Sequence, residues 1–334
     1  MNGGPRYDRQ RERRGRRRRL LLGVALSLAA LGVPLLVRRF GTAPALPPHG
    51  WGRGHRYSWR GLDIHFQQTG EGLPVVLVHS LGPGHDGEEW RRVAEMLARG
   101  CDLLAPDLPG WGLSAAGSTT PAPDLYRDFL LSFLHDVVRR PAALVAAGGA
   151  APFAIAAAAV RPEAVRALAL VSPYGLGNDE PSGVELGQGT LRRGLGRLSA
   201  VPGVGGTAVR LATTRAAIQR HLEREVFAAP ERADAARRER CYRSARQPGA
   251  QRSLQAWLGG GLRAEVAPLL PRPALPVWLG WGRQSSHPAV ETADLWLHQL
   301  PHAALEVFDG CGALPHLEVP VEFTRRLRPF LQRA

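Results

Sequence analysis

From residue 56 onward, short and continuously apolar segments alternate with amphipathic ones. Strands that are apolar on both faces are typical of a parallel sheet covered by helices on each side. Six segments fit this description: residues 73–80, 101–107, 142–148, 165–173, 275–282 and 303–310. The pattern therefore predicts an α/β fold with a doubly wound, mostly parallel sheet.

The segments between these strands predict the helices and one further hairpin. Residues 88–100 and 124–138 place apolar side chains at i, i+3 and i+4, the spacing of an amphipathic helix. Residues 56–70 alternate partially and predict an edge hairpin. From 174 to 272 the pattern is helical throughout, and a loop of this length is implausible in a compact domain. We therefore expect a helical cap at 174–272, inserted into a core formed by residues 56–173 and 273–334.

The N-terminal pattern predicts a membrane anchor. Eighteen uncharged residues, 20–37, follow an arginine-rich tail at 1–19, and this length is at the short end of a transmembrane helix. The arginines place the tail in the cytoplasm by the positive-inside rule, and the folded domain on the outer side of the membrane. Residues 38–55, rich in proline and glycine, are expected to be a linker.

Two alternatives to the anchor stay open. One is a cleaved signal peptide, with Ala43-Pro44-Ala45 as the small-residue site, which would export the protein. The other is a helix that lies on the membrane surface. Arg38 and Arg39 interrupt the usual run from an apolar region to a cleavage site, so the uncleaved anchor is favoured.

Charge and cysteine content exclude several classes of function. The net charge is +14, but residues 1–39 hold eleven arginines against Asp8 and Glu12, which leaves about +5 for the remaining residues. A basic nucleic-acid-binding face is therefore not expected. Cys101, Cys241 and Cys311 lack the spacing of a metal site or a disulfide framework. The glycine pairs match no phosphate-binding fingerprint, and we expect neither a cofactor nor a metal.

Four stretches resemble the α/β-hydrolase superfamily, in its capped branch of esterases and epoxide hydrolases. They are "VVLVHSLGPG" at 75–84, "APDLPGWGLS" at 105–114, "LVAAGGAAP" at 144–152 and "VFDGCGALPHLEVPVEF" at 307–323. With the strand order, the resemblance covers residues 56–332. It implies a serine nucleophile on a strand-to-helix turn, a histidine base and a carboxylate that orients the histidine.

All three implied catalytic positions are substituted. The nucleophile falls on Gly148, the acid on Ser285 and the base on Ala313. A shift in alignment does not restore the nucleophile, because residues 133–171 contain no Ser, Thr or Cys. His316 is a weak candidate for a displaced base, against a capping or packing role. Asp179 is a weak alternative for the acid.

Part of the family's pocket is nevertheless implied. The resemblance assigns the oxyanion-binding N–H groups to Leu81 and Gly149, and Ser80 either lines this pocket or bonds local backbone. The residues favour a membrane-anchored pseudoenzyme that binds a small apolar or carboxylated ligand, or a partner protein. The alternative is a weak or rewired hydrolase of small hydrophobic esters that uses His316 with Ser80 or Ser285. A third hypothesis is a purely structural membrane protein.

Overall fold

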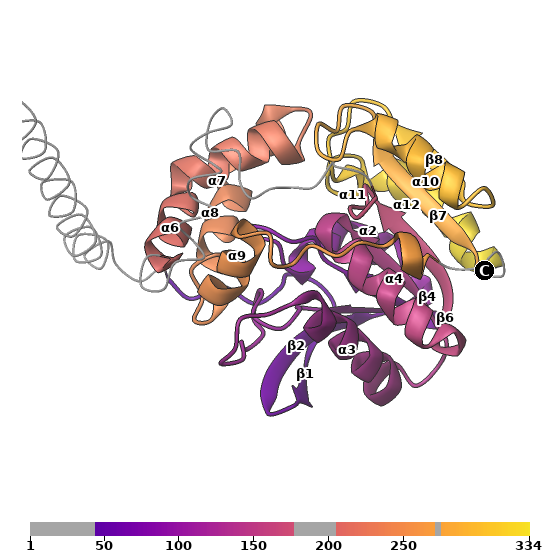
Figure 1. The fold of residues 1–334 in the computed structure, drawn as a ribbon, viewed down its shortest axis with the longest axis horizontal. Helices are drawn as coiled ribbons and strands as arrows, with labels where there is room; N and C mark the ends of the chain where they lie inside the picture. The colour runs from indigo at the N-terminus through magenta and orange to yellow at the C-terminus, as the bar shows by residue number, and fades with distance from the viewer. Residues whose placement is uncertain (1–43, 177–204, 271–274) are drawn as a thin grey trace, which may run out of the picture. The chain divides into compact units, whose positions relative to one another are not determined.

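The computed structural model describes residues 44–176, 205–270 and 275–334. An eight-stranded sheet forms its centre, with the order β1-β2-β4-β3-β5-β6-β7-β8. The strands are β1 Arg53–Trp59, β2 Leu62–Thr69, β3 Glu71–Val78, β4 Arg99–Pro106, β5 Ala142–Ala147, β6 Val165–Val171, β7 Val277–Gly282 and β8 Ala304–Phe308. The six strands and the edge hairpin expected from the sequence are confirmed. Figure 1 shows their arrangement.

The sheet is parallel except at one edge. Strands β1 and β2 pair antiparallel, as do β2 and β4, whereas β4, β3, β5, β6, β7 and β8 run parallel. Every residue of β5 is buried, which explains why its sequence is continuously apolar instead of alternating. The carboxyl ends of the parallel strands therefore meet along one edge, where ligands bind in open α/β sheets.

Two helical layers cover the sheet. Helix α3 (Pro123–Phe133) packs against α4 (Ala151–Val160), and α2 (Arg91–Leu97) packs against α12 (Pro320–Arg333). The shorter elements of the core are η1 Gly87–Trp90, η2 Leu134–Val138, η3 Gly148–Ala150, η4 Pro162–Ala164, η8 Val290–Thr292, α10 Ala293–Gln299 and α11 Pro315–Glu318. Large aromatic side chains fill the core, and the rings of Trp278, Phe308 and Phe323 contact one another.

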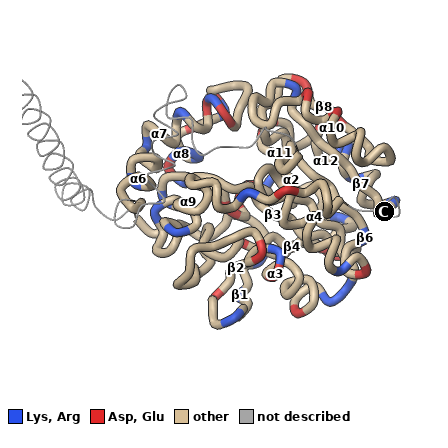
Figure 2. The backbone as a smooth tube through the Cα atoms, in the orientation of Figure 1, with Lys and Arg blue, Asp and Glu red and all other residues tan. Residues whose placement is uncertain are grey.

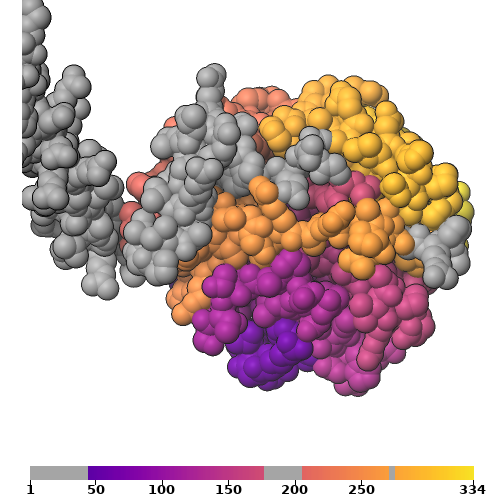
Figure 3. All heavy atoms as spheres, viewed as in Figure 1, coloured from indigo at the N-terminus to yellow at the C-terminus, as the bar shows by residue number. Residues whose placement is uncertain are grey.

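The described part of the predicted cap, residues 205–270, is helical. It contains α6 Gly205–Ala212, α7 Arg215–His221, η5 Leu222–Val226, η6 Pro230–Arg232, α8 Ala235–Ser244, α9 Ala250–Leu258 and η7 Ala267–Leu269. On the face seen in Figure 3, orange cap residues adjoin both the magenta first part of the core and the yellow second part.

The cap contacts the core through loops that flank the sheet's carboxyl edge. A Cβ on Gly84 would lie 2.3 Å from the Cα of Cys241, so α8 approaches this loop as closely as a glycine allows. Buried Glu318 accepts the N–H of Gly312 and that of Ala228 at 3.2 Å, and pairs with Arg232 at 2.7 Å. These contacts fix the cap relative to the C-terminal loop.

Of the two predictions about the N-terminal region, only the one on the linker concerns residues that the structure describes. The span at 20–37 lies outside the described residues, and no described helix is long and apolar enough to cross a membrane. Within the expected linker 38–55, Leu46, His49 and Trp51 are buried, and β1 begins at Arg53. This part of the linker therefore packs onto the core.

Charged residues of both signs are spread over the described elements. In the view of Figure 2, the basic and acidic positions are interspersed along the chain. This distribution agrees with the sequence-based accounting, in which most of the excess positive charge belongs to residues 1–39. The expectation that the protein does not bind nucleic acid stays a prediction.

Candidate functional site

The turn after β5 keeps the backbone of a nucleophile-bearing turn without its side chain. Strand β5 ends at Ala147, the turn η3 follows, and α4 begins at Ala151. Gly148 has φ +51°, a left-handed conformation that a residue with a Cβ adopts only at a cost. Glycine therefore relieves the strain of this turn and leaves open the space that a side chain would take.

The hydroxyl of Ser80 fills that space. An ideal Cβ built on Gly148 would lie 2.5 Å from Ser80 Oγ. Ser80 follows β3, is buried, and donates its backbone N–H to Glu89 Oε1 at 2.8 Å. Its hydroxyl makes no hydrogen bond to another described residue. A hydroxyl from a neighbouring loop thus stands where the side chain of a nucleophilic serine would begin.

The cap occupies the region beside Ala313, the position to which the resemblance assigns the catalytic histidine. The N–H of Ala313 donates to Val226 O at 3.0 Å. A Cβ on Gly312 would lie 2.4 Å from the same oxygen. Val226 ends the π-helical turn η5, which continues α7 directly, and such turns are frequent at functional sites.

This π-helical turn brings a histidine and a carboxylate to the Gly148 turn. His221 Nδ1 lies 2.9 Å from Glu225 Oε2, and His221 Nε2 is buried without a hydrogen-bond partner among the described residues. Both residues line a small cavity with Ser80, Gly148 and Ala313, which we call the elbow pocket. An imidazole held at Nδ1 by a carboxylate, with Nε2 free, is the arrangement of a general base.

A second histidine–carboxylate pair lies next to the first. His85 Nδ1 is 2.8 Å from Glu89 Oε2, and its ring meets that of His221 edge to face at 6.2 Å. Burial alone raises the pKa of Glu89, but the imidazoles of His316, 3.5 Å away, and His85 outweigh it and hold the pKa well below its usual range. Glu89 therefore stays ionised, and it ties His85 to the backbone of Ser80.

The elbow pocket has a volume of about 40 Å³, enough for a few water molecules. Leu81 and Gly149, the residues to which the resemblance assigns the oxyanion donors, both line it. They also line an adjoining apolar cavity of about 30 Å³, together with Trp257 and Leu262. The two cavities form a narrow, largely apolar space above the Gly148 turn.

Three other candidates from the sequence do not enter this pocket. His316 is fully buried and stacks on Trp90 at 4.1 Å, and it is not among the residues that line the elbow pocket. Burial lowers its pKa, which favours the neutral imidazole. The Ser285 hydroxyl donates to Pro288 O at 2.7 Å within its own loop. Asp179 lies outside the described residues.

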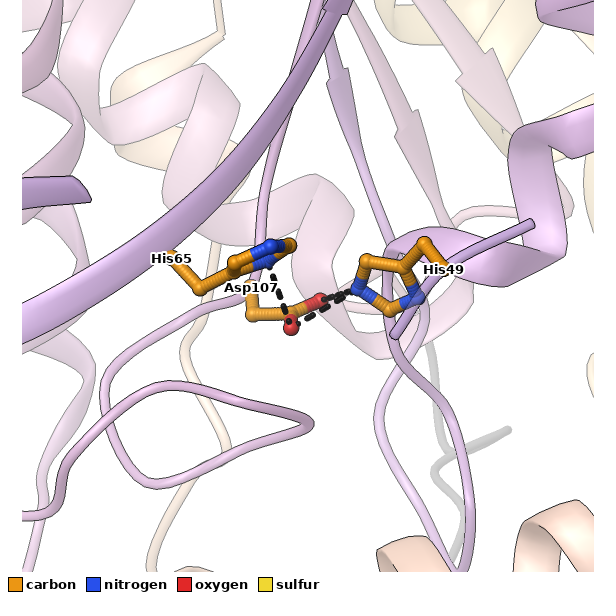
Figure 4. A group of neighbouring side chains, drawn as sticks. All are labelled: His49, His65 and Asp107. Atoms are coloured by element: carbon orange, nitrogen blue, oxygen red, sulfur yellow. Dashed lines mark hydrogen bonds and ion pairs between the residues drawn. The ribbon is translucent and has the colours of Figure 1, made fainter. Parts of the chain in front are cut away.

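His49, His65 and Asp107 form a buried cluster with the side-chain types of a metal site (Figure 4). The Asp107 carboxylate already accepts two backbone N–H groups, and His49 Nε2 lies 2.9 Å from its Oδ2. The Arg240 guanidinium donates to His49 Nδ1 at 2.6 Å. Because both carboxylate oxygens already accept hydrogen bonds, we interpret the cluster as a structural one that holds residues 46–51 on the core.

The core carries the sequence pattern of a known family. Residues 75–326 match the sequence profile described as "Alpha/beta hydrolase family". The chain belongs to this family. It is 25% identical over 287 residues to the 2-hydroxymuconate semialdehyde hydrolase of Pseudomonas sp. (strain CF600), which covers 82% of this chain and 92% of that protein. The resemblance inferred from the four sequence motifs is confirmed.

Solved structures show the same fold. Cfl2 from Burkholderia cenocepacia superposes with a TM-score of 0.71 at 24% identity, covering 86% of this chain and 98% of that one. A meta-cleavage product hydrolase from Pseudomonas fluorescens IP01 gives a TM-score of 0.68 at 20% identity, covering 84% and 98%. At these identities the likeness concerns the fold alone.

The contact between Ser80 and Gly148 can be tested by stability measurements. Gly148→Ala places a Cβ 2.5 Å from Ser80 Oγ in a left-handed backbone, and we expect it to lower the free energy of unfolding by about 2 kcal/mol. In a Ser80→Ala background the loss should shrink by about 1 kcal/mol, because the Ser80 Cβ is 3.6 Å from the new methyl group. Urea denaturation of the four proteins measures this coupling.

Gly310→Ala is the matched control, since Gly310 also has a left-handed φ of +66° but no atom lies within 4 Å of its ideal Cβ. It should show the backbone cost alone, with no dependence on Ser80. Strictly additive effects of Gly148→Ala and Ser80→Ala would contradict the close contact.

The structural role of Asp107 predicts a pH-dependent loss of stability. Burial alone raises the pKa of Asp107, but His49 outweighs it and holds the pKa well below its usual range. The carboxylate therefore stabilises the fold above its unfolded pKa of about 3.9, and this contribution fades as the pH falls below that value. At pH 7, Asp107→Ala should cost about 3 kcal/mol or more in urea denaturation.

The difference in the free energy of unfolding between wild type and Asp107→Ala should become smaller at acidic pH. Asp63→Ala removes an exposed carboxylate paired with Arg56 and should cost less than about 0.5 kcal/mol at any pH. Equal losses for the two variants would show that the buried cluster does not stabilise the fold.

Proposed function

We propose that the protein is a hydrolase of small hydrophobic esters or related acyl compounds, with its catalytic groups relocated around the Gly148 turn. Ser80 is the nucleophile, His221 the general base, and Glu225 the carboxylate that orients the histidine. The observation that carries the proposal is the position of the Ser80 hydroxyl, 2.5 Å from the Cβ site of residue 148, in a pocket shared with His221 and Glu225.

The chemistry follows the order of a serine hydrolase. His221 Nε2 takes the proton from Ser80 Oγ as that oxygen bonds to the acyl carbon, and Glu225 stabilises the imidazolium through Nδ1. The ester C–O bond then breaks, and His221 returns the proton to the departing alcohol. Water, deprotonated by the same nitrogen, then attacks the acyl carbon; the bond to Ser80 Oγ breaks, the acid leaves, and His221 returns the proton to Ser80 Oγ.

Two features support stabilisation of the tetrahedral intermediate. Leu81 and Gly149 line the pocket, and their N–H groups are the donors that the family resemblance assigns to the developing oxyanion. Gly149 also precedes α4, whose N-terminal end favours negative charge.

The size and lining of the site favour small apolar substrates. The elbow pocket and its apolar neighbour measure about 40 Å³ and 30 Å³, so a substrate enters only when the cap moves outward. Leu81, Trp257 and Leu262 then offer an apolar surface to an acyl group. A relative named as a hydrolase, matched over 82% of this chain, supports turnover over ligand binding alone.

The pseudoenzyme interpretation rests on the three substituted family positions and is the competing outcome. On that interpretation the elbow pocket holds a small apolar or carboxylated ligand, or the domain binds a partner protein. Attachment to a membrane through residues 20–37, with the folded domain outside, stays a prediction that fractionation of the full chain would test.

Hydrolysis of a short-to-medium acyl ester panel tests the proposal. Ser80→Ala and His221→Gln should each lower kcat/KM at least about 100-fold, because each removes a group that takes part in bond formation. Glu225→Gln should lower it less, since it disturbs only the orientation and charge of the imidazole. Circular dichroism of each variant confirms that it is folded.

Ser285→Ala is the matched serine control and should leave turnover unchanged. Absence of turnover in the wild-type chain would leave a binding protein. Turnover that is lost in His316→Gln but retained in Ser80→Ala would restore His316 as the base and exclude the proposed arrangement.

A further inference from the structure

A second and much larger cavity lies on the other side of His85. It has a volume of about 430 Å³, within the range of sites for small organic molecules. Its walls are the segment Gly84–Glu95, which runs from the loop after β3 into α2, and the start of α8 in the cap. Leu222, His316 and Leu317 complete it. We call this cavity the polar cleft.

The carboxylates that line the polar cleft already have partners within the protein. Asp86 pairs with Arg240 at 3.2 Å. Glu88 accepts the N–H of Gly50 at 2.8 Å. Glu89 is held by Ser80 and His85, as described above. The remaining two carboxylates are Glu95, paired with Arg91, and Asp234, the N-cap of α8. Each carboxylate of the cleft is thus held by groups of the protein itself.

Two arginines of the cleft, in contrast, have no carboxylate partner in the described part of the chain. Neither Arg92 nor Arg237 pairs with a carboxylate among the described residues, and the contact found for Arg237 is with the ring of Phe227. His316 is fully buried, and its Nε2 lies 3.5 Å from Glu89 Oε1, so this imidazole already faces a carboxylate of the cleft.

We propose that the polar cleft binds a small organic anion, with Arg237 and Arg92 as the cationic groups that hold it. The ligand carries a carboxylate or a phosphate group, because arginine recognises both through paired N–H donors. Its apolar part lies against Leu222 and Leu317. This site is separate from the elbow pocket and does not depend on the proposed hydrolysis.

A ligand in the polar cleft would affect the elbow pocket through residues that belong to both sites. His85 lines both cavities, and Glu89 links His85 to the backbone N–H of Ser80 at 2.8 Å. The opposite wall belongs to the cap, whose α8 carries Arg237. An anion held between α2 and α8 therefore bridges cap and core, and it favours the closed arrangement of the cap.

Isothermal titration calorimetry of the full chain with benzoate and with inorganic phosphate tests the site, against sodium chloride at equal ionic strength. We expect saturable binding of at least one anion, weakened tenfold or more by Arg237→Gln and by Arg92→Gln. Benzoate binding without phosphate binding would assign a carboxylate ligand, and the reverse a phosphate ligand. Arg220→Gln, at an exposed position of α7 outside the cleft, is the matched control.

Two results would overturn the inference. One is the absence of saturable binding by either anion. The other is binding whose affinity is the same in wild type and Arg237→Gln, or falls equally in Arg220→Gln. Ser80→Ala separates this inference from the proposed function, because anion binding at the polar cleft should persist in that variant even when hydrolysis is lost.

Discussion

The missing Cβ at residue 148 is the constraint on which the arrangement of the site depends. A left-handed turn between β5 and α4 is built into the family's fold, and glycine adopts it at the lowest cost. The atom that glycine leaves out is replaced by an oxygen from the neighbouring loop, because Ser80 Oγ reaches to 2.5 Å from its position. Any larger residue at 148 would displace Ser80, so the two positions are coupled through space.

At the C-terminal loop, a segment that is distant in the sequence again fills the space beside a small residue. Ala313 leaves room that the π-helical turn of the cap fills, and the N–H of Ala313 bonds to the last carbonyl of that turn at 3.0 Å. The extra residue per turn in a π-helix shifts its side chains relative to α7. Here that turn carries Glu225 beside His221, with 2.9 Å between carboxylate and imidazole. In the proposed mechanism, the cap thus supplies the imidazole for which position 313 has no side chain.

The sequence predicted the sheet well because each strand from β3 to β8 can be recognised from its own run of apolar residues. Fully buried strands such as β5 must be apolar at every position, and that pattern does not depend on distant contacts. The positions of Gly148 and Ala313 were predictable for the same reason, since motifs fix the loops that carry them. The sequence did not predict that Ser80 and His221 would lie beside these two positions, because neither residue is close to Gly148 or Ala313 along the chain. The one available signal was the spacing of His85 to Glu89 and of His221 to Glu225, four residues in each case.

In the proposed mechanism the cap has two roles that oppose each other. Its contacts with Gly84, Gly312 and Glu318 fix His221 where a base is needed, and the same contacts reduce the elbow pocket to about 40 Å³. Opening the cap would admit a substrate but withdraw His221, because this residue lies within the same stretch of the cap, residues 221–232, as the groups that contact Gly312 and Glu318. Chemistry in such a site takes place only after closure around the substrate, and closure is where the free energy of substrate binding must be used. A small substrate satisfies this requirement best, since it fits the space that remains when His221 has returned.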